Sequence, residues 1–166
     1  MKIRIANHDD AAAVASLIMN AAATQLKDDF TIAGWKLFKD LVAEETQRVL
    51  IDNERYQYFL AITESNDRQN DQIIGVISIK ENYHLFHLFV SPDWQKKGIG
   101  KQLWFNFLSF LEENIDHKVP QNQGPFITVN SSTLAIPFYT KLGFVKSQPK
   151  QTKKGVTFTP MTFSLK

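Results

Sequence analysis

The residues best suited to chemistry lie in a short loop that is rich in lysine and glycine. The loop and the helical turn that follows it contain three lysines and two glycines: Lys96, Lys97, Gly98, Gly100 and Lys101. A glycine has no side chain to keep a ligand from the backbone, and a helix that starts at about Ile99 has unpaired N–H groups in its first turn. The lysines add positive charge. The pattern therefore predicts an anion site, and a phosphate or pyrophosphate is the expected anion.

Two common phosphate-binding motifs do not fit this loop. A P-loop has a glycine, a four-residue gap, and then Gly, Lys and Ser or Thr, which the loop lacks. The dinucleotide-binding fingerprint could begin at Gly98 and Gly100, but its third glycine position is occupied by Leu103. A nucleotide-binding protein that uses either motif is therefore disfavoured.

The strand that must position the loop runs from His84 to Val90 and reads HLFHLFV. Such an almost unbroken apolar run is typical of a central strand that is buried on both faces. The long helix from about Ile99 to Glu113 connects this strand to another, expected at Phe126 to Val129, which predicts that the two strands are parallel. Two parallel strands that diverge leave a crevice at their carboxyl ends, where the loop lies.

The run Gln95-Lys96-Lys97-Gly98-Ile99-Gly100, preceded by Leu88-Phe89-Val90-Ser91-Pro92, closely resembles the coenzyme A pyrophosphate loop of the GNAT superfamily of N-acetyltransferases. A second signature of that family follows, with Asn130 at a strand end and then the segment from Ala135 to Phe144. The resemblance rests on two separate motifs in the right order, and it implies acetyl-CoA as cosubstrate. The coenzyme A contacts that it implies are Leu88, Phe89, Val90, Gln95, Lys96, Lys97, Gly98, Ile99, Gly100, Lys101, Asn130 and Tyr139.

A general base is the first catalytic group that acetylation of an amine requires. An amine like that of lysine, with a pKa of about 10.4, is almost wholly protonated at pH 7, so a base or a water chain must take its proton. Counting back from Gln95, His84 falls where several members of the family carry a Glu or His that serves as the base. The alternatives are water, a carboxylate such as Glu81, or a His84 that is only hydrogen-bonded at the edge of the groove.

Two further groups complete the expected chemistry. The oxyanion that forms on the thioester could be met by a backbone N–H near Phe89 or Val90, if the strand opens at a bulge as it does in the family. The departing thiolate needs a proton donor, and a phenol with a pKa of about 10 can supply the proton. Tyr139 stands at the family's position for that role. The alternative is an aromatic ring that packs its helix against the sheet.

The histidines predict no metal site. His84 and His87 are three positions apart, which on a regular strand places them on opposite faces, so they cannot share an ion. His8 and His117 are expected in solvent. We therefore expect no metal cofactor.

The expected fold class is α/β (α+β), with the GNAT fold over residues 1–166 as one domain. The resemblance implies a mixed, mostly antiparallel seven-stranded sheet flanked by helices, with a splayed parallel strand pair at its centre. The other expected elements are a strand at Ile3 to Ile5, a helix capped by Asn7 that ends near Ala23, a helix from Gly34 to Leu50, an antiparallel meander of strands at Tyr56 to Thr63 and Ile73 to Lys80, a short helix capped by Ser132 or Thr133, and final strands from Phe144 and from Val156 to Leu165.

Composition narrows the class further. The chain has no cysteine, which excludes a disulfide framework and a thiolate nucleophile. Its net charge is only +2 and its basic residues are spread out, which gives weak support for nucleic acid binding. The N-terminus turns polar at Asn7 before a signal-peptide core could form, and no apolar run approaches membrane-spanning length. We expect a soluble cytoplasmic protein with neither nucleic acid nor membrane as partner.

The sequence does not identify the amine that accepts the acetyl group. In the family, the segment at Gln25 to Ala33 borders the acceptor groove, and four residues there could touch a substrate: Lys27, Asp28, Asp29 and Phe30. A solvated loop tip is the favoured alternative. A small molecule, a polyamine, an antibiotic, a peptide N-terminus and a protein lysine all remain open.

The predicted function is transfer of an acetyl group from acetyl-CoA to a primary amine by direct attack in a ternary complex. The alternative is a non-catalytic acyl-CoA-binding or regulatory domain on the same fold, which loss of Asn130 or Tyr139 would have favoured. Both residues are present. A homodimer is also possible, because the apolar final strand with Phe158, Met161 and Phe163 could extend an interface.

Overall fold

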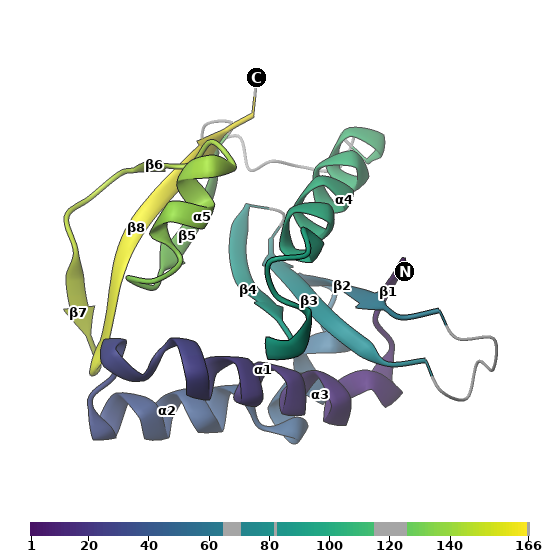
Figure 1. Ribbon diagram of the computed structural model, residues 1–166, viewed down its shortest axis with the longest axis horizontal. Helices are drawn as coiled ribbons and strands as arrows, with labels where there is room; N and C mark the ends of the chain where they lie inside the picture. Colours follow the sequence, from purple (N-terminus) through teal and green to yellow (C-terminus); the bar gives the residue numbers. More distant parts are fainter. Residues whose placement is uncertain (65–70, 82, 115–125, 166) are drawn as a thin grey trace.

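A computed structural model describes residues 1–64, 71–81, 83–114 and 126–165. Within them, one twisted sheet has helices on both of its faces (Figure 1). The strands are β1 (Lys2–Ile5), β2 (Tyr56–Ile62), β3 (Ile73–Lys80), β4 (His84–Val90), β5 (Phe126–Ser131), β6 (Val145–Lys146), β7 (Gln151–Lys153) and β8 (Val156–Ser164). The α-helices are α1 (Ala11–Gln25), α2 (Ile32–Val42), α3 (Glu44–Ile51), α4 (Ile99–Glu113) and α5 (Ile136–Lys141).

The sheet confirms the expected fold class. Its strand order is β1-β2-β3-β4-β5-β8-β6, and β4 and β5 form a parallel pair at the centre. The other pairings among the described strands are antiparallel. The sheet has eight strands rather than the expected seven, because a polar segment forms β7 and pairs with β8. The turn between them uses Lys154 and Gly155, both at positive φ as in a tight hairpin turn.

One of the expected helices is divided into two in the structure. The sequence predicts a helix from Gly34 to Leu50, but Ala43 is extended, at φ −58° and ψ 149°, and separates α2 from α3. A hydrogen bond bridges the break, because the buried side chain of Gln47 donates to the carbonyl oxygen of Leu41. Thr31 caps α2 by accepting from the Gly34 N–H.

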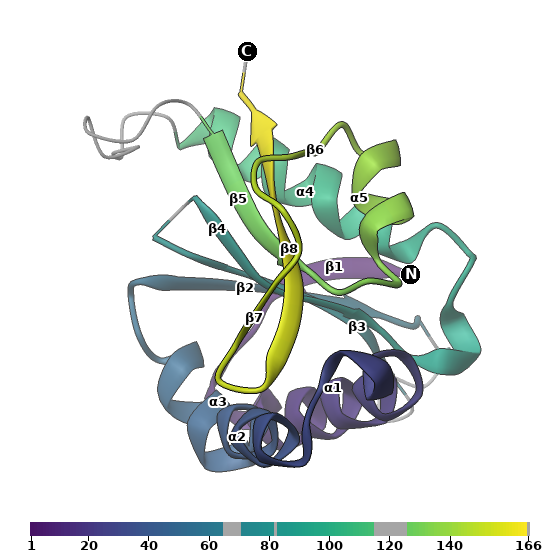
Figure 2. The ribbon, with the colours of Figure 1, turned by 90° about the vertical axis from the view of Figure 1, so that its left-hand side faces the viewer.

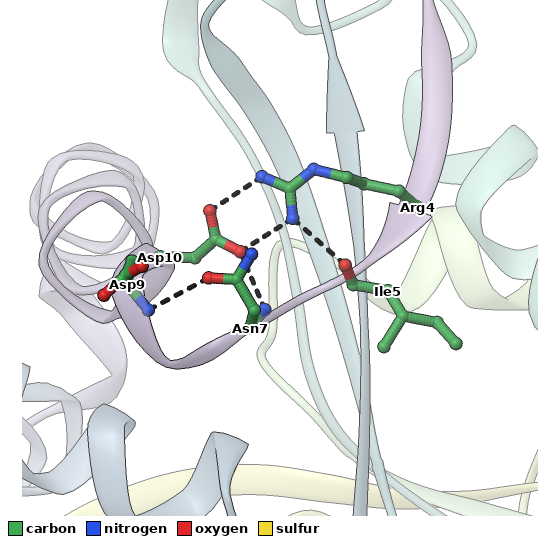
Figure 3. A network of polar contacts seen from close by, with 5 residues as sticks. All are labelled: Arg4, Ile5, Asn7, Asp9 and Asp10. Carbon is green, nitrogen blue, oxygen red and sulfur yellow. Dashed lines mark hydrogen bonds and ion pairs between the residues drawn. The ribbon is translucent and has the colours of Figure 1, made fainter.

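The start of α1 follows the prediction and is tied to β1 (Figure 3). Asn7 is the N-cap of the turn before α1, and its side chain accepts from the Asp9 N–H. Asp10 accepts from the Asn7 N–H at 2.8 Å and from two guanidinium nitrogens of Arg4 at 2.7 Å each. Burial opposes ionisation of Asp10, but the bonds from Arg4 and Asn7 prevail and lower its pKa below the ordinary value.

Two apolar clusters form the core, one on each face of the sheet. Alternate residues of β2 divide between them: Tyr58 and Leu60 face the helices α1 to α3, whereas Phe59 and Ala61 face α4. The side chain of Trp104 on α4 is fully buried, and its truncation to Ala would cost about 3–5 kcal/mol.

The strand pair at the centre is splayed. β4 and β5 are paired only at His84 with Thr128 and at Leu85 with Val129, and beyond these residues the two strands separate (Figure 1). The expectation that β4 is buried on both faces is therefore wrong for its carboxyl half, where Leu88 and Val90 are half-buried beside the opening.

Some predictions fall outside the described residues, namely the turn over residues 65–70, Asn82, the loop over residues 115–125 and His117. In the described part of the chain, no helix is both long and apolar enough to cross a membrane.

Candidate active site

Two cavities meet beside Tyr139 at the opening between β4 and β5. The first, of about 540 Å³, is lined by the Gln95–Lys101 loop together with α5, and we call it the loop cavity. The second, of about 400 Å³, is lined by α2, β4, β5 and the turn between β7 and β8, and we call it the hairpin cavity. Residues that line both are Gln25, Leu88, Ser132, Ala135 and Tyr139.

The loop cavity contains most of the predicted anion site. Its lining includes Gln95, Lys96, Gly98, Ile99, Gly100 and Lys101. The side-chain amide of Gln95 donates to the carbonyl oxygen of Val90 at 3.0 Å, which ties the loop to the end of β4. Lys97 is predicted to contact the same ligand, but its ammonium lies 4.6 Å from the ring centroid of Trp94 and it is not part of the cavity lining.

The two glycines of the loop are suited to their positions for different structural reasons. Gly98 is the N-cap of α4 at φ 81°, a left-handed conformation that glycine adopts readily, and a Cβ there would meet only Gln102 at 3.9 Å. A Cβ on Gly100 would lie 3.2 Å from the ring of Phe138. Gly98 therefore keeps the backbone open towards a ligand, whereas Gly100 allows α4 to approach α5.

The bulge in β4 is at Phe86, upstream of the expected place. Ser78 of β3 is opposite His87, whereas the next residue, Ile79, is opposite Leu85, so Phe86 is the extra residue. The bulge also moves His84 to the face of His87, contrary to the expectation for a regular strand. Leu85 packs in the cluster beside α4, whereas His87 contacts the ring of Tyr58 on the other face.

Backbone N–H groups of β4 point into the opening between the strands. The Ser91 N–H donates to the Ile74 carbonyl oxygen of β3, and hydrogen-bonded pairs alternate along an antiparallel ladder. Phe89 therefore pairs with β3, and its N–H is not available. The N–H groups of Leu88 and Val90 face the opposite edge, where β5 has separated, so these two are the candidate oxyanion donors.

His84 lines the hairpin cavity and is held by a side-chain hydrogen bond. Its Nδ1 lies 2.8 Å from Thr128 Oγ1, and that hydroxyl donates to the Tyr83 carbonyl oxygen at 3.5 Å. In the tautomer in which Nδ1–H donates to this hydroxyl, Nε2 of the neutral ring is unprotonated. Burial, with a smaller contribution from the charge of Lys80, lowers the pKa of His84, so this neutral form prevails at pH 7.

Tyr139 lies on α5 with only 6% of its surface exposed. Its ring packs edge-on against Phe138 and Phe144, so Tyr139 also has the packing contacts that the alternative interpretation expects. Burial raises the pKa of its phenol, which therefore stays protonated at neutral pH as a hydrogen-bond donor, although the same shift opposes complete transfer of its proton. Asn130, on β5 opposite Pro160, is exposed and lines the hairpin cavity rather than the loop cavity.

The α1–α2 connection is only in part the solvated loop that its composition favours, because Lys27 and Asp28 are exposed whereas Asp29 and Phe30 line the hairpin cavity. Asp29 is 6% exposed and accepts from both the N–H and the hydroxyl of Thr133, at 2.8 and 2.6 Å. Phe30 contacts the rings of Trp35 and Phe38. No pattern in the sequence indicates the Asp29–Thr133 contact, which joins the α1–α2 connection to the β5–α5 connection. Neither Ser132 nor Thr133 is the N-cap of α5, which is Ala135, although Ser132 Oγ accepts from the Ala135 N–H.

The β7–β8 hairpin forms one wall of the hairpin cavity. Its tip reaches the start of α2 (Figure 2), where the Thr31 N–H donates to the Gly155 carbonyl oxygen at 2.8 Å. A Cβ on Gly34 would be 2.1 Å from that oxygen, and a Cβ on Gly155 would be 2.2 Å from Thr31 Oγ1. Only a pair of glycines permits this approach. The Lys154-Gly155 turn was the one signal in the sequence that could have predicted the hairpin.

In the part of the chain that the structure describes, no three histidine or acidic side chains are grouped as metal ligands.

Comparisons with known proteins agree on one family. The family model described as acetyltransferase (GNAT) domain matches residues 22–165, and the chain belongs to this family. Its members use acyl-CoA, which supports acyl transfer as the chemistry of this chain. Among curated proteins, none matches the chain.

Solved structures of low sequence identity share the fold. A GCN5-related N-acetyltransferase from Rhodopseudomonas palustris is 22% identical, with a TM-score of 0.75 over 99% of this chain and 95% of that chain. The PaiA N-acetyltransferase from Thermoplasma acidophilum, in complex with coenzyme A, is 16% identical, with a TM-score of 0.76 over 99% and 100%. A ribosomal-protein-alanine N-acetyltransferase from Brucella melitensis is 20% identical, with a TM-score of 0.67 over 99% and 100%.

Proposed function

We propose that this protein transfers an acetyl group from acetyl-CoA to a primary amine by direct attack in a ternary complex. The observation that carries the proposal is the meeting of two cavities at Tyr139 and Leu88. The loop cavity offers an anion site for the pyrophosphate, and the hairpin cavity holds His84. The two substrates can thus enter from opposite sides and meet at the separation of β4 and β5, without a covalent enzyme intermediate.

The residues of the loop cavity fit coenzyme A. Lys96 and Lys101 supply positive charge, and Gly98 leaves open space at the start of α4, whose first N–H groups favour an anion. Acetyl-CoA supplies the acetyl group as an activated thioester.

Proton transfer is divided between the two sides of the junction. Nε2 of His84 accepts the proton of the amine, directly or through one water, because Nδ1 is held by Thr128. The N–H groups of Leu88 and Val90 meet the negative charge that develops on the thioester oxygen. The phenol of Tyr139 gives a proton or a hydrogen bond to the departing sulfur, whose thiol has a pKa of about 8.5.

Thermal melts and turnover test this assignment together. Coenzyme A should raise the melting temperature more than ATP or NAD does, because a ligand that binds only the native state adds RT ln(1 + [L]/Kd) to its stability. Acetyl-CoA with a panel of primary amines should release free thiol. Equal stabilisation by all three ligands would contradict the coenzyme A site. Binding without turnover of any amine would favour the non-catalytic alternative.

Other predictions stay proposals. We infer one domain over residues 1–166 and a cytoplasmic location, with no nucleic acid or membrane partner. A homodimer also stays a prediction, but the three side chains on which it was based are used within the chain. Met161 is buried in the core, Phe163 packs against Trp104, and Phe158 lines the hairpin cavity.

A further inference from the structure

The walls of the hairpin cavity are largely apolar and aromatic. Phe30, Phe38 and Phe89 form a continuous contact series, with ring centroids 5.2 Å apart for the first pair and 6.5 Å for the second. The other aliphatic and phenylalanine residues of the lining are Leu26, Leu37, Leu41, Leu85, Phe86, Leu88, Val129, Ala135, Val156 and Phe158. Leu37 and Leu41 are 51% and 39% exposed, although they line a cavity. A ligand with a large apolar group would cover these surfaces and gain about 25 cal/mol for each Å² buried.

The charges of the cavity are unbalanced. Lys153 and Lys154 line it from the hairpin turn, and neither forms a salt bridge with a described residue. Asp29 is the one carboxylate among the lining residues that the structure describes, and both of its oxygens accept hydrogen bonds from Thr133. Lys80, which lies outside the lining, adds positive charge near His84.

The position of Lys154 carries a conformational cost. Its φ is 50°, a left-handed conformation that costs a non-glycine residue about 1–3 kcal/mol when the surroundings impose it. Glycine or asparagine would occupy this turn position with less strain. Lys154 is exposed as well as part of the cavity lining, so its ammonium is accessible to an anionic ligand there.

We propose that the acceptor is an amino carboxylate with a large apolar side group, such as a bulky α-amino acid, and that Lys153 and Lys154 bind its carboxylate. The proposal rests on the proposed function, because it assigns the hairpin cavity to the amine. A polyamine or an aminoglycoside needs several carboxylates to balance its charges, and the described lining offers no carboxylate that is free of Thr133. An apolar amino carboxylate matches both the walls and the charge of the cavity.

The substrate arm of the test uses matched sets of amines. Leucine, methionine and phenylalanine are each compared with their carboxamide and with the amine that lacks the carboxylate, and spermidine and kanamycin represent polycations. Release of free thiol from acetyl-CoA is measured. We expect kcat/KM for the best amino acid to exceed that of its two neutralised analogues by about tenfold, which corresponds to a single charge-assisted contact of about 1.4 kcal/mol.

The variant arm removes the two charges. Lys153→Gln with Lys154→Gln should raise KM for the amino acid about tenfold and change kcat/KM for the amine without a carboxylate less than about twofold. Lys150→Gln with Lys146→Gln is the matched control, since both residues are exposed lysines outside the cavity lining. The coenzyme A Kd should be the same in all of these proteins.

Three results would overturn the proposal. If spermidine or kanamycin is the best substrate, the assignment of the acceptor is wrong while acetyl transfer to an amine stands. The same holds if the double variant affects an amino acid and its decarboxylated analogue equally. If no amine in the panel releases thiol although coenzyme A binds, the proposed function itself fails, and the acceptor class fails with it.

Discussion

The two cavities are built in different ways. The loop cavity is formed mainly by one continuous run, from the end of β4 through the Gln95–Lys101 loop into α4, with α5 beside it. The hairpin cavity combines four parts of the chain that are distant in sequence: the α1–α2 connection with α2, β4, β5 with α5, and the β7–β8 hairpin. The loop cavity therefore depends on local backbone geometry, whereas the hairpin cavity depends on contacts between distant segments. Two glycines of similar φ, Gly98 in the lining of the loop cavity and Gly155 in the turn of the hairpin that borders the other cavity, allow the difference to be tested.

Replacing Gly155 should have the largest effect and should be confined to the hairpin cavity. Gly155 has a φ of 77°, and a Cβ would clash with Thr31 Oγ1 and the Gly34 N atom, so the hairpin tip must withdraw from α2. A displacement that costs about 3 kcal/mol lowers kcat/KM for the amine by about a hundredfold. We expect Gly155→Val to show this loss in steady-state kinetics, with the coenzyme A Kd almost unchanged.

Gly98→Val is the reciprocal control. Gly98 has a similar φ of 81°, so a valine there would cause comparable backbone strain, but Gly98 lines the loop cavity. This variant should weaken coenzyme A binding and leave the amine KM nearly unaltered. If both variants raise both constants equally, the two cavities do not function as separate sites.

His84→Gln should have an effect of similar size, because loss of a positioned base lowers kcat/KM by about a hundredfold. Because burial lowers the pKa of His84, the acidic limb of the kcat/KM profile should lie below pH 6.5, with activity rising as pH rises and the ring loses its proton. The limb should vanish in the variant. His8→Gln, at an exposed histidine that pairs with Asp52, should keep it. A normal pH profile of kcat/KM in His84→Gln would show that water or another group is the general base.

Tyr139→Phe should have a smaller effect, because a thiolate is a moderate leaving group even when it is not protonated. We expect kcat to fall about tenfold, at or below the lower end of the range for general acid catalysis, with the coenzyme A Kd unchanged. Tyr83→Phe is the matched control, since that hydroxyl donates to Glu81 and lines neither cavity. A variant that lost binding but kept kcat would show that the ring of Tyr139 only packs.

His87 should affect stability rather than rate. The ring is buried, Nε2 has no partner among the described residues, and burial lowers the pKa to about 3. As pH falls below about 6.5 the unfolded chain gains a proton that the folded chain does not, so the free energy of unfolding falls by about 1.4 kcal/mol for each pH unit down to about 3. Denaturant melts between pH 7 and pH 5 should therefore show a flatter dependence in His87→Leu than in the parent or in His8→Gln.

The loop cavity could be predicted from the sequence because its signals are local. The strand, the glycine at the start of α4 and the motif residues from Gln95 to Lys101 are continuous in the chain, and their geometry follows from backbone preferences. What local signals did not reveal is that Lys97 lies against Trp94 and that Gly100 faces Phe138. Both depend on packing between elements.

The hairpin cavity could be predicted only in part. His84 was found by counting from the loop, but the bulge at Phe86 was not, because an apolar strand that is flanked by apolar cores on both faces gives no alternation to show a change of register. Asp29 and Thr133 are ordinary polar residues in sequence, and their contact is a tertiary event. The break at Ala43 has the same cause, because its neighbours are good helix formers and packing decides against them.

The contact of the hairpin tip with α2 also bears on the order in which the protein folds. Asp29 and Thr133 are 104 positions apart, and the segments that carry Thr31 and Gly155 lie still farther apart along the chain. Closing such long loops costs more chain entropy than forming the contiguous strand, loop and helix, so these contacts should form late and open first. In mild denaturant the Thr31 amide should therefore exchange with solvent before that of Ser91, and coenzyme A should still bind after the capacity to select an acceptor is lost.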